Sequence, residues 1–379
     1  MRVLLTTYGS RGDVEPLIGL ALELRRLGAE VVVCAPPDFA PRLAEVGVAM
    51  VPFGPSAKAL TKAKPPPDGL PRRAAEVIAG LFEAVLPAAE GCDVLLTAGM
   101  MPAAAGARSV AEKLGIDCVY TTFEQQTLPS PHHPPLAYAG RPFPPGAGDL
   151  WEFDAQTIDD LFGEALNVNR ATIGLPPVEN VRDYVHGDRP WLASDPVLDP
   201  CLDPGVLQTG AWFAPDTRPL PADLLAFLDA GPPPVYVGFG SMPVHIPAEV
   251  VGGHRVIVSR GWGELDETGS FVVGEVNHQA LFGRVAAVIH HGGAGTTTTA
   301  ARAGAPQVVL PQAADQPYWA RRVTELGIGA AIATFDELPG ALASLDRARA
   351  LEVSATIRTD GAATAAAHLT RRPQISSMT

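Results

Sequence analysis

The sequence predicts an α/β protein with two doubly wound, Rossmann-like domains that face a central cleft. Three observations support this prediction. Apolar strand patterns alternate with helical patterns in both halves of the 379-residue chain. A glycine turn over residues 9–13 joins the first strand to the first helix, and a second glycine turn over 292–295 repeats the arrangement late in the chain. A Pro-rich stretch over 200–222 separates the two halves.

The first half alternates regularly between strand and helix. Its expected strands cover 3–7, 31–35, 49–53, 93–97 and 118–122, and its expected helices cover 14–27, 39–45, 72–89 and 103–114. Pro and Gly are dense over 127–150, which predicts a long surface loop, and a helical pattern resumes over 151–173. We assign residues 1–205 to the first domain.

The second half repeats the alternation. Its expected strands cover 235–239, 256–259, 271–273, 286–290 and 307–310, and its expected helices start near Asn277, Thr296 and Asp315. We assign 206–222 to a linker and 223–379 to the second domain, with a C-terminal helix that can cross back to the first. Residues 239–256 leave little room for a crossover helix, and the stretch 336–352 is also short for the elements expected there.

The bulk composition is that of a globular protein of the cytoplasm. Hydrophobic residues make up 47% of the chain and charged residues 18%, and a formal net charge of −13 argues against nucleic acid as a partner. The four cysteines are not paired at metal-ligand spacing, which suits free thiols in a reducing compartment. No apolar run approaches the ~20 residues of a membrane span, so we expect a cytoplasmic monomer without one.

The most informative motif is the stretch 286–297, which has a buried strand, a tight glycine turn and a helix start. Small residues over 292–294 let backbone amides approach a ligand closely. A helix N-terminus binds anions, and His291 at its mouth adds a donor, with a positive charge if it is protonated. The threonines at 296–299 are expected to cap the helix with their hydroxyls. The stretch is either a diphosphate site that needs no metal or an ordinary packing turn.

Two aspartates at helix starts each have two interpretations. Asp13 either caps the first helix or acts as a general base that takes a proton from an acceptor hydroxyl. A helix N-terminus lowers the pKa of a carboxylate and so weakens it as a base. A phenol acceptor would need less help from the base than an alcohol, because the pKa of a phenol is about 10. Asp315 either caps a later helix or joins Gln316 in hydrogen bonds to sugar hydroxyls.

Six short motifs follow one another along the chain. They are Gly9-Ser-Arg-Gly-Asp13, Gly238-Phe-Gly-Ser241, Ser259-Arg-Gly-Trp262, Gly274-Glu-Val-Asn-His278, His290-His-Gly-Gly-Ala-Gly-Thr296 and Ala314-Asp-Gln-Pro317. Their series resembles that of the GT-B glycosyltransferases. More narrowly, it is similar to the actinomycete enzymes that glycosylate vancomycin- and teicoplanin-type glycopeptide aglycones, and the resemblance covers nearly the whole chain.

This resemblance implies an inverting, metal-independent hexosyltransferase. Its first domain would bind the acceptor, with Asp13 as the base, and its second domain would bind a nucleotide-sugar. The sequence is consistent with metal independence, since it has no Asp-x-Asp pair to hold a divalent cation. The leaving diphosphate would be held by groups of His291, Gly293, Gly295 and Thr296. Further contacts to the diphosphate or sugar would come from turns at Ser10, Arg11 and Ser241.

The resemblance also implies the donor and the acceptor. Trp262 would lie beside the nucleobase, with backbone groups of Val276 bonding to the base, although it could equally be a core aromatic. An intact pair of Asp315 and Gln316 goes with fully hydroxylated sugars in this family. We therefore expect UDP-glucose or UDP-N-acetylglucosamine, with a TDP-sugar as the second choice, a glycopeptide aglycone as acceptor, an acceptor loop over 125–150, and no cofactor.

Three other functions fit parts of the pattern. A UDP-N-acetylglucosamine 2-epimerase shares the architecture but would carry more carboxylates for acid–base chemistry. A non-catalytic nucleotide-sugar-binding helper protein would have no need of Asp13, His291 and the Asp-Gln pair. A dinucleotide oxidoreductase would carry Gly-x-Gly-x-x-Gly after its first strand, which this chain lacks.

Overall fold

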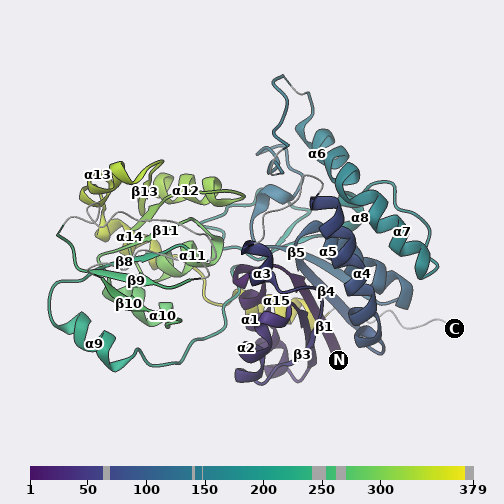
Figure 1. Cartoon of the computed structure of the whole chain (residues 1–379), viewed down its shortest axis with the longest axis horizontal. Helices are drawn as coiled ribbons and strands as arrows, with labels where there is room; N and C mark the ends of the chain where they lie inside the picture. Colours follow the sequence, from purple (N-terminus) through teal and green to yellow (C-terminus); the bar gives the residue numbers. More distant parts are fainter. Residues whose placement is uncertain (63–68, 139–140, 147, 241–252, 262–269, 372–379) are drawn as a thin grey trace. The chain divides into compact units, whose positions relative to one another are not determined.

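The computed structural model describes residues 1–62, 69–138, 141–146, 148–240, 253–261 and 270–371. Within these residues the chain forms two compact units, each built on one parallel sheet (Figure 1). The prediction of two Rossmann-like, doubly wound domains is therefore confirmed.

The first unit holds a seven-stranded parallel sheet in the order β3-β2-β1-β4-β5-β6-β7. Its strands are β1 Arg2–Tyr8, β2 Glu30–Ala35, β3 Ala49–Pro52, β4 Val94–Gly99, β5 Asp117–Thr122, β6 Trp191–Leu192 and β7 Leu207–Gln208. Its helices are α1 Arg11–Arg26, α2 Ala40–Glu45, α3 Ala57–Lys62, α4 Gly69–Ala89, α5 Met101–Leu114, α6 Leu150–Ile158, α7 Glu164–Thr172, α8 Val181–His186 and α15 Gly361–Thr370. The strand order reverses between β1 and β4, and ligands of such sheets bind at the carboxyl ends of strands beside this switch point.

Buried apolar side chains and helix-ending glycines explain the elements of this unit. Leu4 of β1 and Leu95 of β4 are fully buried in a core that α4 and α5 complete. Both α1 and α5 stop before a glycine with positive φ, Gly28 at 84° and Gly115 at 66°, which is the usual way to end a helix.

The second unit holds a six-stranded sheet in the order β10-β9-β8-β11-β12-β13. Its strands are β8 Val235–Gly238, β9 Val256–Ser259, β10 Phe271–Val273, β11 Ala287–His290, β12 Gln307–Val309 and β13 Gly329–Ala331. Its helices are α9 Ala222–Asp229, α10 His278–Leu281, α11 Ala294–Arg302, α12 Gln316–Glu325, α13 Leu338–Ala343 and α14 Arg347–Ser354. The first six strands of the first unit follow the same order, with β8 in the place of β1 and β11 in the place of β4. The switch point of the second sheet therefore lies between β8 and β11.

Both faces of the second sheet are buried, as is usual for parallel sheets. Tyr236 of β8 and Val288 of β11 enter one core with α9 and α10. Their neighbours Val237 and Ile289 enter a second core, on the other face, with α13. This alternation follows from the two-residue period of a strand.

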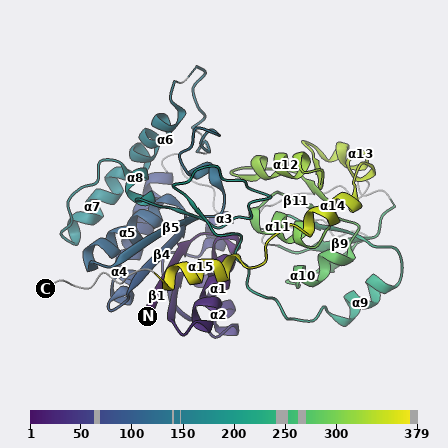
Figure 2. The same ribbon diagram turned by 180° about the vertical axis from the view of Figure 1, so that it is seen from behind.

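The chain passes between the units more often than the continuous ranges 1–205, 206–222 and 223–379 predict. Residues Asp195–Pro200 belong to the second unit, and Cys201–Ala214 return to the first. The expected linker therefore contains β7, which pairs with β6. Helix α15 also belongs to the first unit, where it packs beside α1 (Figure 2).

Candidate functional site

The turn after β11 is built around Gly292 and the buried His290. Gly292 has a φ of 95°, and a Cβ added to it would lie 2.8 Å from Val309 Cγ1 and 3.1 Å from the Gln316 carbonyl oxygen, so glycine is required there. The Gly292 N–H donates to His290 Nδ1 over 3.0 Å. Since burial lowers the pKa of His290 to about 3, the neutral ring carries its proton on Nε2 and donates to Gln307 Oε1 over 2.9 Å. The turn is thus fixed from within the core.

His291 lies between two glycines at the end of the same strand. A Cβ added at Gly293 would lie 2.7 Å from its Nε2, and one added at Gly240 would lie 3.2 Å from its Cε1. Burial lowers the pKa of His291 to about 4, so the ring is neutral near pH 7 and does not carry the positive charge considered from sequence. Its Nδ1 is buried and has no hydrogen-bond partner among the described residues. A neutral imidazole in this position can still form a hydrogen bond with a ligand.

Helix α11 leaves its first amides available. Its N-cap is Gly293, which has no side chain to form a cap. The first backbone N–H of the helix to form an i to i−4 hydrogen bond is that of Thr297, which donates to the Gly293 carbonyl over 3.0 Å. The N–H groups of 294–296 therefore point out of the N-terminal end of the helix, where the helix dipole is positive.

The expected hydroxyl caps on α11 are wrong. The hydroxyls of 297–299 each donate to the carbonyl four residues earlier, over 2.7 to 3.0 Å. Thr296 is placed differently, because the residue four positions before it is Gly292, which precedes the helix and has a positive φ. Of the four threonines, Thr296 is therefore the one whose hydroxyl can serve a ligand at the helix start.

The pair Asp315 and Gln316 begins α12 after a strained residue, Ala314, with a φ of 55°. Asp315 forms no side-chain cap, so the capping interpretation is wrong; its Oδ2 accepts from Trp319 Nε1 over 2.8 Å. Burial raises the pKa of Asp315. The Gln316 Oε1 accepts from two backbone N–H groups of the preceding loop, at 2.7 and 3.1 Å, so its amide nitrogen remains as a donor. Gly292 packs on the Gln316 backbone, and the pair therefore adjoins the glycine turn.

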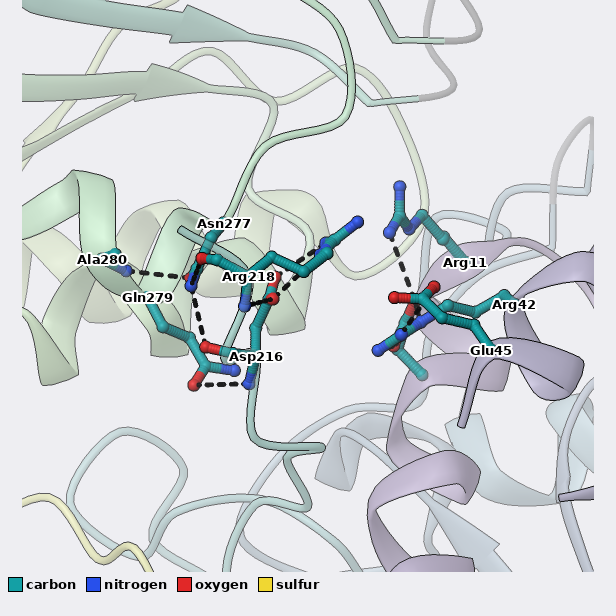
Figure 3. Close-up of polar contacts among 9 residues, drawn as sticks. Arg11, Arg42, Glu45, Asp216, Arg218, Asn277, Gln279 and Ala280 are labelled. Atoms are coloured by element: carbon teal, nitrogen blue, oxygen red, sulfur yellow. Dashed lines mark hydrogen bonds and ion pairs between the residues drawn. The ribbon is translucent and has the colours of Figure 1, made fainter. Parts of the chain in front are cut away.

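The loop that carries Val276 is anchored through Asn277 (Figure 3). The Asn277 side-chain nitrogen donates to the carbonyl oxygens of Asp216 and Arg218 over 2.8 and 2.9 Å. Its Oδ1 accepts from the Ala280 N–H over 3.0 Å and so caps α10. The Val276 side chain is buried in the core, which leaves only its backbone for the expected contact with a nucleobase.

Asp13 lies in the first turn of α1, at the switch point of the first unit. It forms a capping box in which the Ser10 N–H donates to Asp13 Oδ2 over 2.7 Å and the Ser10 hydroxyl accepts from the Gly12 N–H over 3.3 Å. The N-cap is thus Ser10, and Asp13 contributes to the capping box as the third residue of the helix. Both carboxylate oxygens lie against glycines: a Cβ added at Gly9 would lie 2.1 Å from Oδ2, and one added at Gly99 would lie 3.0 Å from Oδ1. The carboxylate is therefore held in one place.

Arg11, one residue after Ser10, belongs to a cluster of charges on α1 and α2. Its Nη2 donates to Glu15 Oε1 over 3.2 Å, and Arg42 Nε donates to the same oxygen over 3.1 Å (Figure 3). The guanidinium of Arg11 is thus partly engaged within its own helix before any ligand binds.

Sequence reasoning missed a buried polar cluster near the end of β5. Tyr120 is 2% exposed and Glu124 is 7% exposed. The Thr122 hydroxyl donates to the Glu124 carbonyl oxygen, and the Thr127 hydroxyl donates to the Thr122 hydroxyl, each over 3.0 Å. Burial, with the charges of Glu124 and Asp13, raises the pKa of Tyr120. These residues follow no motif spacing, so only the fold brings them near the carboxylate of Asp13.

Some predicted features lie outside the described residues. They are Ser241, Trp262 and most of the short connection between β8 and β9. In the part of the chain that the structure does describe, no group of His, Cys, Asp or Glu side chains could hold a metal ion. No helix there is long and apolar enough to cross a membrane.

Comparison with known proteins decides the family. A model of the glycosyltransferase family 28 N-terminal domain matches residues 3–130, and one of the erythromycin biosynthesis protein CIII-like C-terminal domain matches 268–374. The vancomycin aglycone glucosyltransferase of Amycolatopsis orientalis is 54% identical, over 97% of this chain and 96% of that protein. The chain belongs to the glycosyltransferases of glycopeptide-antibiotic biosynthesis. The family predicted from the six motifs is confirmed, and the epimerase and the helper protein are not favoured.

Further relatives of this glycosyltransferase differ in the sugar that their names carry. A dTDP-epi-vancosaminyltransferase of the same organism is 49% identical, over 95% of this chain and 92% of that protein. Among solved structures, the glycotransferase of kitacinnamycin has a TM-score of 0.71 at 21% identity, covering 98% of both chains. The glycosyltransferase VinC in complex with dTDP has a TM-score of 0.64 at 19% identity, over 98% of this chain and 99% of that one. These structures support the fold alone.

Proposed function

We propose that this glycosyltransferase moves a hexose of the glucose or N-acetylglucosamine type from a UDP- or TDP-sugar to a hydroxyl of a glycopeptide aglycone. The transfer inverts the anomeric centre and needs no metal ion. The observation that carries the proposal is the start of α11, where uncapped amides and the neutral His291 meet at one strand end. Such preorganised donors at a helix end can stabilise the charge of a leaving diphosphate.

The donor sugar is inferred from Asp315 and Gln316. The pair offers carboxylate oxygen as acceptor and amide N–H as donor, which together match the paired hydroxyls of an intact hexose. The relatives leave this choice open, since a glucosyltransferase is 54% identical and a dTDP-epi-vancosaminyltransferase is 49% identical. The pair therefore supports glucose or N-acetylglucosamine over a deoxysugar.

The proposed reaction divides its tasks between the two units. The acceptor oxygen attacks the anomeric carbon, the bond from that carbon to the diphosphate oxygen breaks, and the acceptor proton passes to the carboxylate of Asp13. The amides of Gly295 and Thr296, with the Thr296 hydroxyl, bind the departing diphosphate. A carboxylate accepts a proton more readily from an acidic phenol of the aglycone than from an aliphatic alcohol, because the pKa of a phenol is about 10.

Calorimetric titration tests the donor half of this proposal. The protein is titrated with UDP, TDP, UDP-glucose and UDP-N-acetylglucosamine in the presence of EDTA, and the best donor is then tested for transfer to a vancomycin-type aglycone. Binding of a nucleotide-sugar with EDTA present, followed by transfer, supports the proposal. Absence of binding for all four ligands would contradict it, and binding that requires Mg²⁺ would contradict its metal-free part.

A further inference from the structure

Trp319 is the side chain that fixes the carboxylate of Asp315. It lies on α12, is 1% exposed, and belongs to a core that includes Tyr318 and Val323. An indole N–H can only donate, and a buried one needs an acceptor. That acceptor is Asp315 Oδ2, at 2.8 Å. The contact spans one turn of the helix, so it holds the carboxylate at a fixed angle to α12.

This contact decides which polar atoms remain for a ligand. With Oδ2 committed to the indole, Oδ1 is the carboxylate oxygen left to accept from a sugar hydroxyl. Gln316 is arranged in a complementary way, since its Oε1 is committed to two loop amides at 2.7 and 3.1 Å and its nitrogen is left to donate. Each side chain of the pair thus has one polar atom bound to the protein and one that a sugar can use.

We propose that Trp319 is a positioning residue that makes the donor site selective for hydroxylated sugars, by binding Asp315 Oδ2 so that Oδ1 meets a sugar hydroxyl. The inference rests on the proposed function, since it takes Asp315 and Gln316 as the sugar contacts. It adds a residue that touches neither the sugar nor the nucleotide and acts only through Asp315.

The position of α12 itself does not depend on the indole N–H. Tyr318 donates its hydroxyl to the buried carboxylate of Asp199. Arg322 donates to the carbonyl oxygens of Leu198 and Val197, over 2.8 and 3.2 Å. Removing the indole N–H while keeping an aromatic ring should therefore leave the helix in place and release only Asp315.

The test compares Trp319→Phe with Tyr318→Phe. Each variant removes one buried donor from α12, but only the first removes the donor that serves Asp315. We expect Trp319→Phe to bind UDP-glucose about tenfold more weakly, the lower end of the loss for a hydrogen bond to a charged group, while its affinity for UDP stays within about twofold of wild type. Tyr318→Phe should keep the wild-type ratio of the two affinities.

An Asp315→Ala background supplies the second arm. Without a carboxylate to position, adding Trp319→Phe should cost no further affinity for UDP-glucose. A Trp319→Phe variant that loses UDP and UDP-glucose affinity equally, or that adds its full loss in the Asp315→Ala background, would overturn the inference and leave the proposed function standing. Failure of the wild-type protein to bind either ligand would overturn both.

A measurement on the wild-type protein covers the case in which Trp319→Phe does not fold. The chain has five tryptophans, so ¹⁵N-labelled indoles give few N–H resonances. The resonance that moves in Asp315→Ala should also move when UDP-glucose binds and stay in place when UDP binds. An indole resonance that ignores the sugar, or that responds equally to both ligands, would contradict the inference.

Discussion

Gly295 provides a test of the proposed diphosphate site that is separate from folding. It is the second residue of α11, it is exposed, and no atom lies within 4 Å of a Cβ added there. Alanine is favoured over glycine within helices by about 0.8–1.0 kcal/mol. We therefore expect Gly295→Ala to unfold at the wild-type temperature or slightly above it.

A bound diphosphate would make the same methyl group unfavourable. If the Gly295 amide donates to the diphosphate, the methyl at its Cα stands where the anion must approach. The loss of one hydrogen bond to a charged group costs about 1.5–3 kcal/mol, which is roughly 10- to 160-fold in Kd. UDP and UDP-glucose should both bind to Gly295→Ala more weakly by at least about tenfold.

Calorimetry with UDP and thermal denaturation without ligand measure the two effects. The matched control is Gly340→Ala in the same unit, because Gly340 is the third residue of α13, is exposed, and also has no atom within 4 Å of an added Cβ. The control should keep wild-type UDP affinity. Wild-type affinity in Gly295→Ala as well would refute the reasoning, and the glycine turn would then serve packing alone.

The other predictions concern the proposed base, Asp13, and the stability of the protein at acid pH. Asp13→Asn should lower kcat by about 10²–10⁴-fold with unchanged affinity for UDP-glucose, and equal losses in both would exclude a role as base. Burial lowers the pKa of His186 to about 4, of His290 to about 3 and of His291 to about 4, against about 6.5 in the unfolded chain. Their neutral forms stabilise the fold above pH 6.5, and this stability is lost as the pH falls toward 4. Denaturation midpoints should drop across that interval, and a flat profile would contradict the assignment.

The strands of the second unit show how much of the fold can be predicted from local sequence. β9 Val256–Ser259 and β10 Phe271–Val273 are found at the residues predicted for them. Each is a short β-branched or aromatic run, the kind of local signal that a buried parallel strand leaves. By contrast, β6 and β7 were missed: each has two residues, too few for any period, and they are strands because they pair with β5 and with each other.

The candidate site divides in the same way. The tight glycine turn and the free amides at the start of α11 follow from local sequence and were predicted, whereas the hydroxyl caps predicted there were wrong. The neutral state of His291 could not be, because its pKa is set by residues packed around it. The same holds for Asp315, whose position suggested a cap. Its carboxylate instead bonds to Trp319, because a buried indole N–H without an acceptor would cost more than an uncapped helix end.

The two glycine turns have the same strand-turn-helix arrangement but differ in how their helices are capped. At the start of α1, the capping box of Ser10 and Asp13 occupies the first polar groups of the helix and places a carboxylate there. An anion is disfavoured at such a helix start, whereas a proton can be accepted. At the start of α11, Gly293 provides no capping side chain, and the threonine hydroxyls of 297–299 donate to the carbonyl oxygens four residues earlier. The dipole and amides there remain available to an anion. In the proposed reaction, two similar strand-turn-helix units would therefore supply a base in one domain and a leaving-group site in the other, and their helix caps differ accordingly.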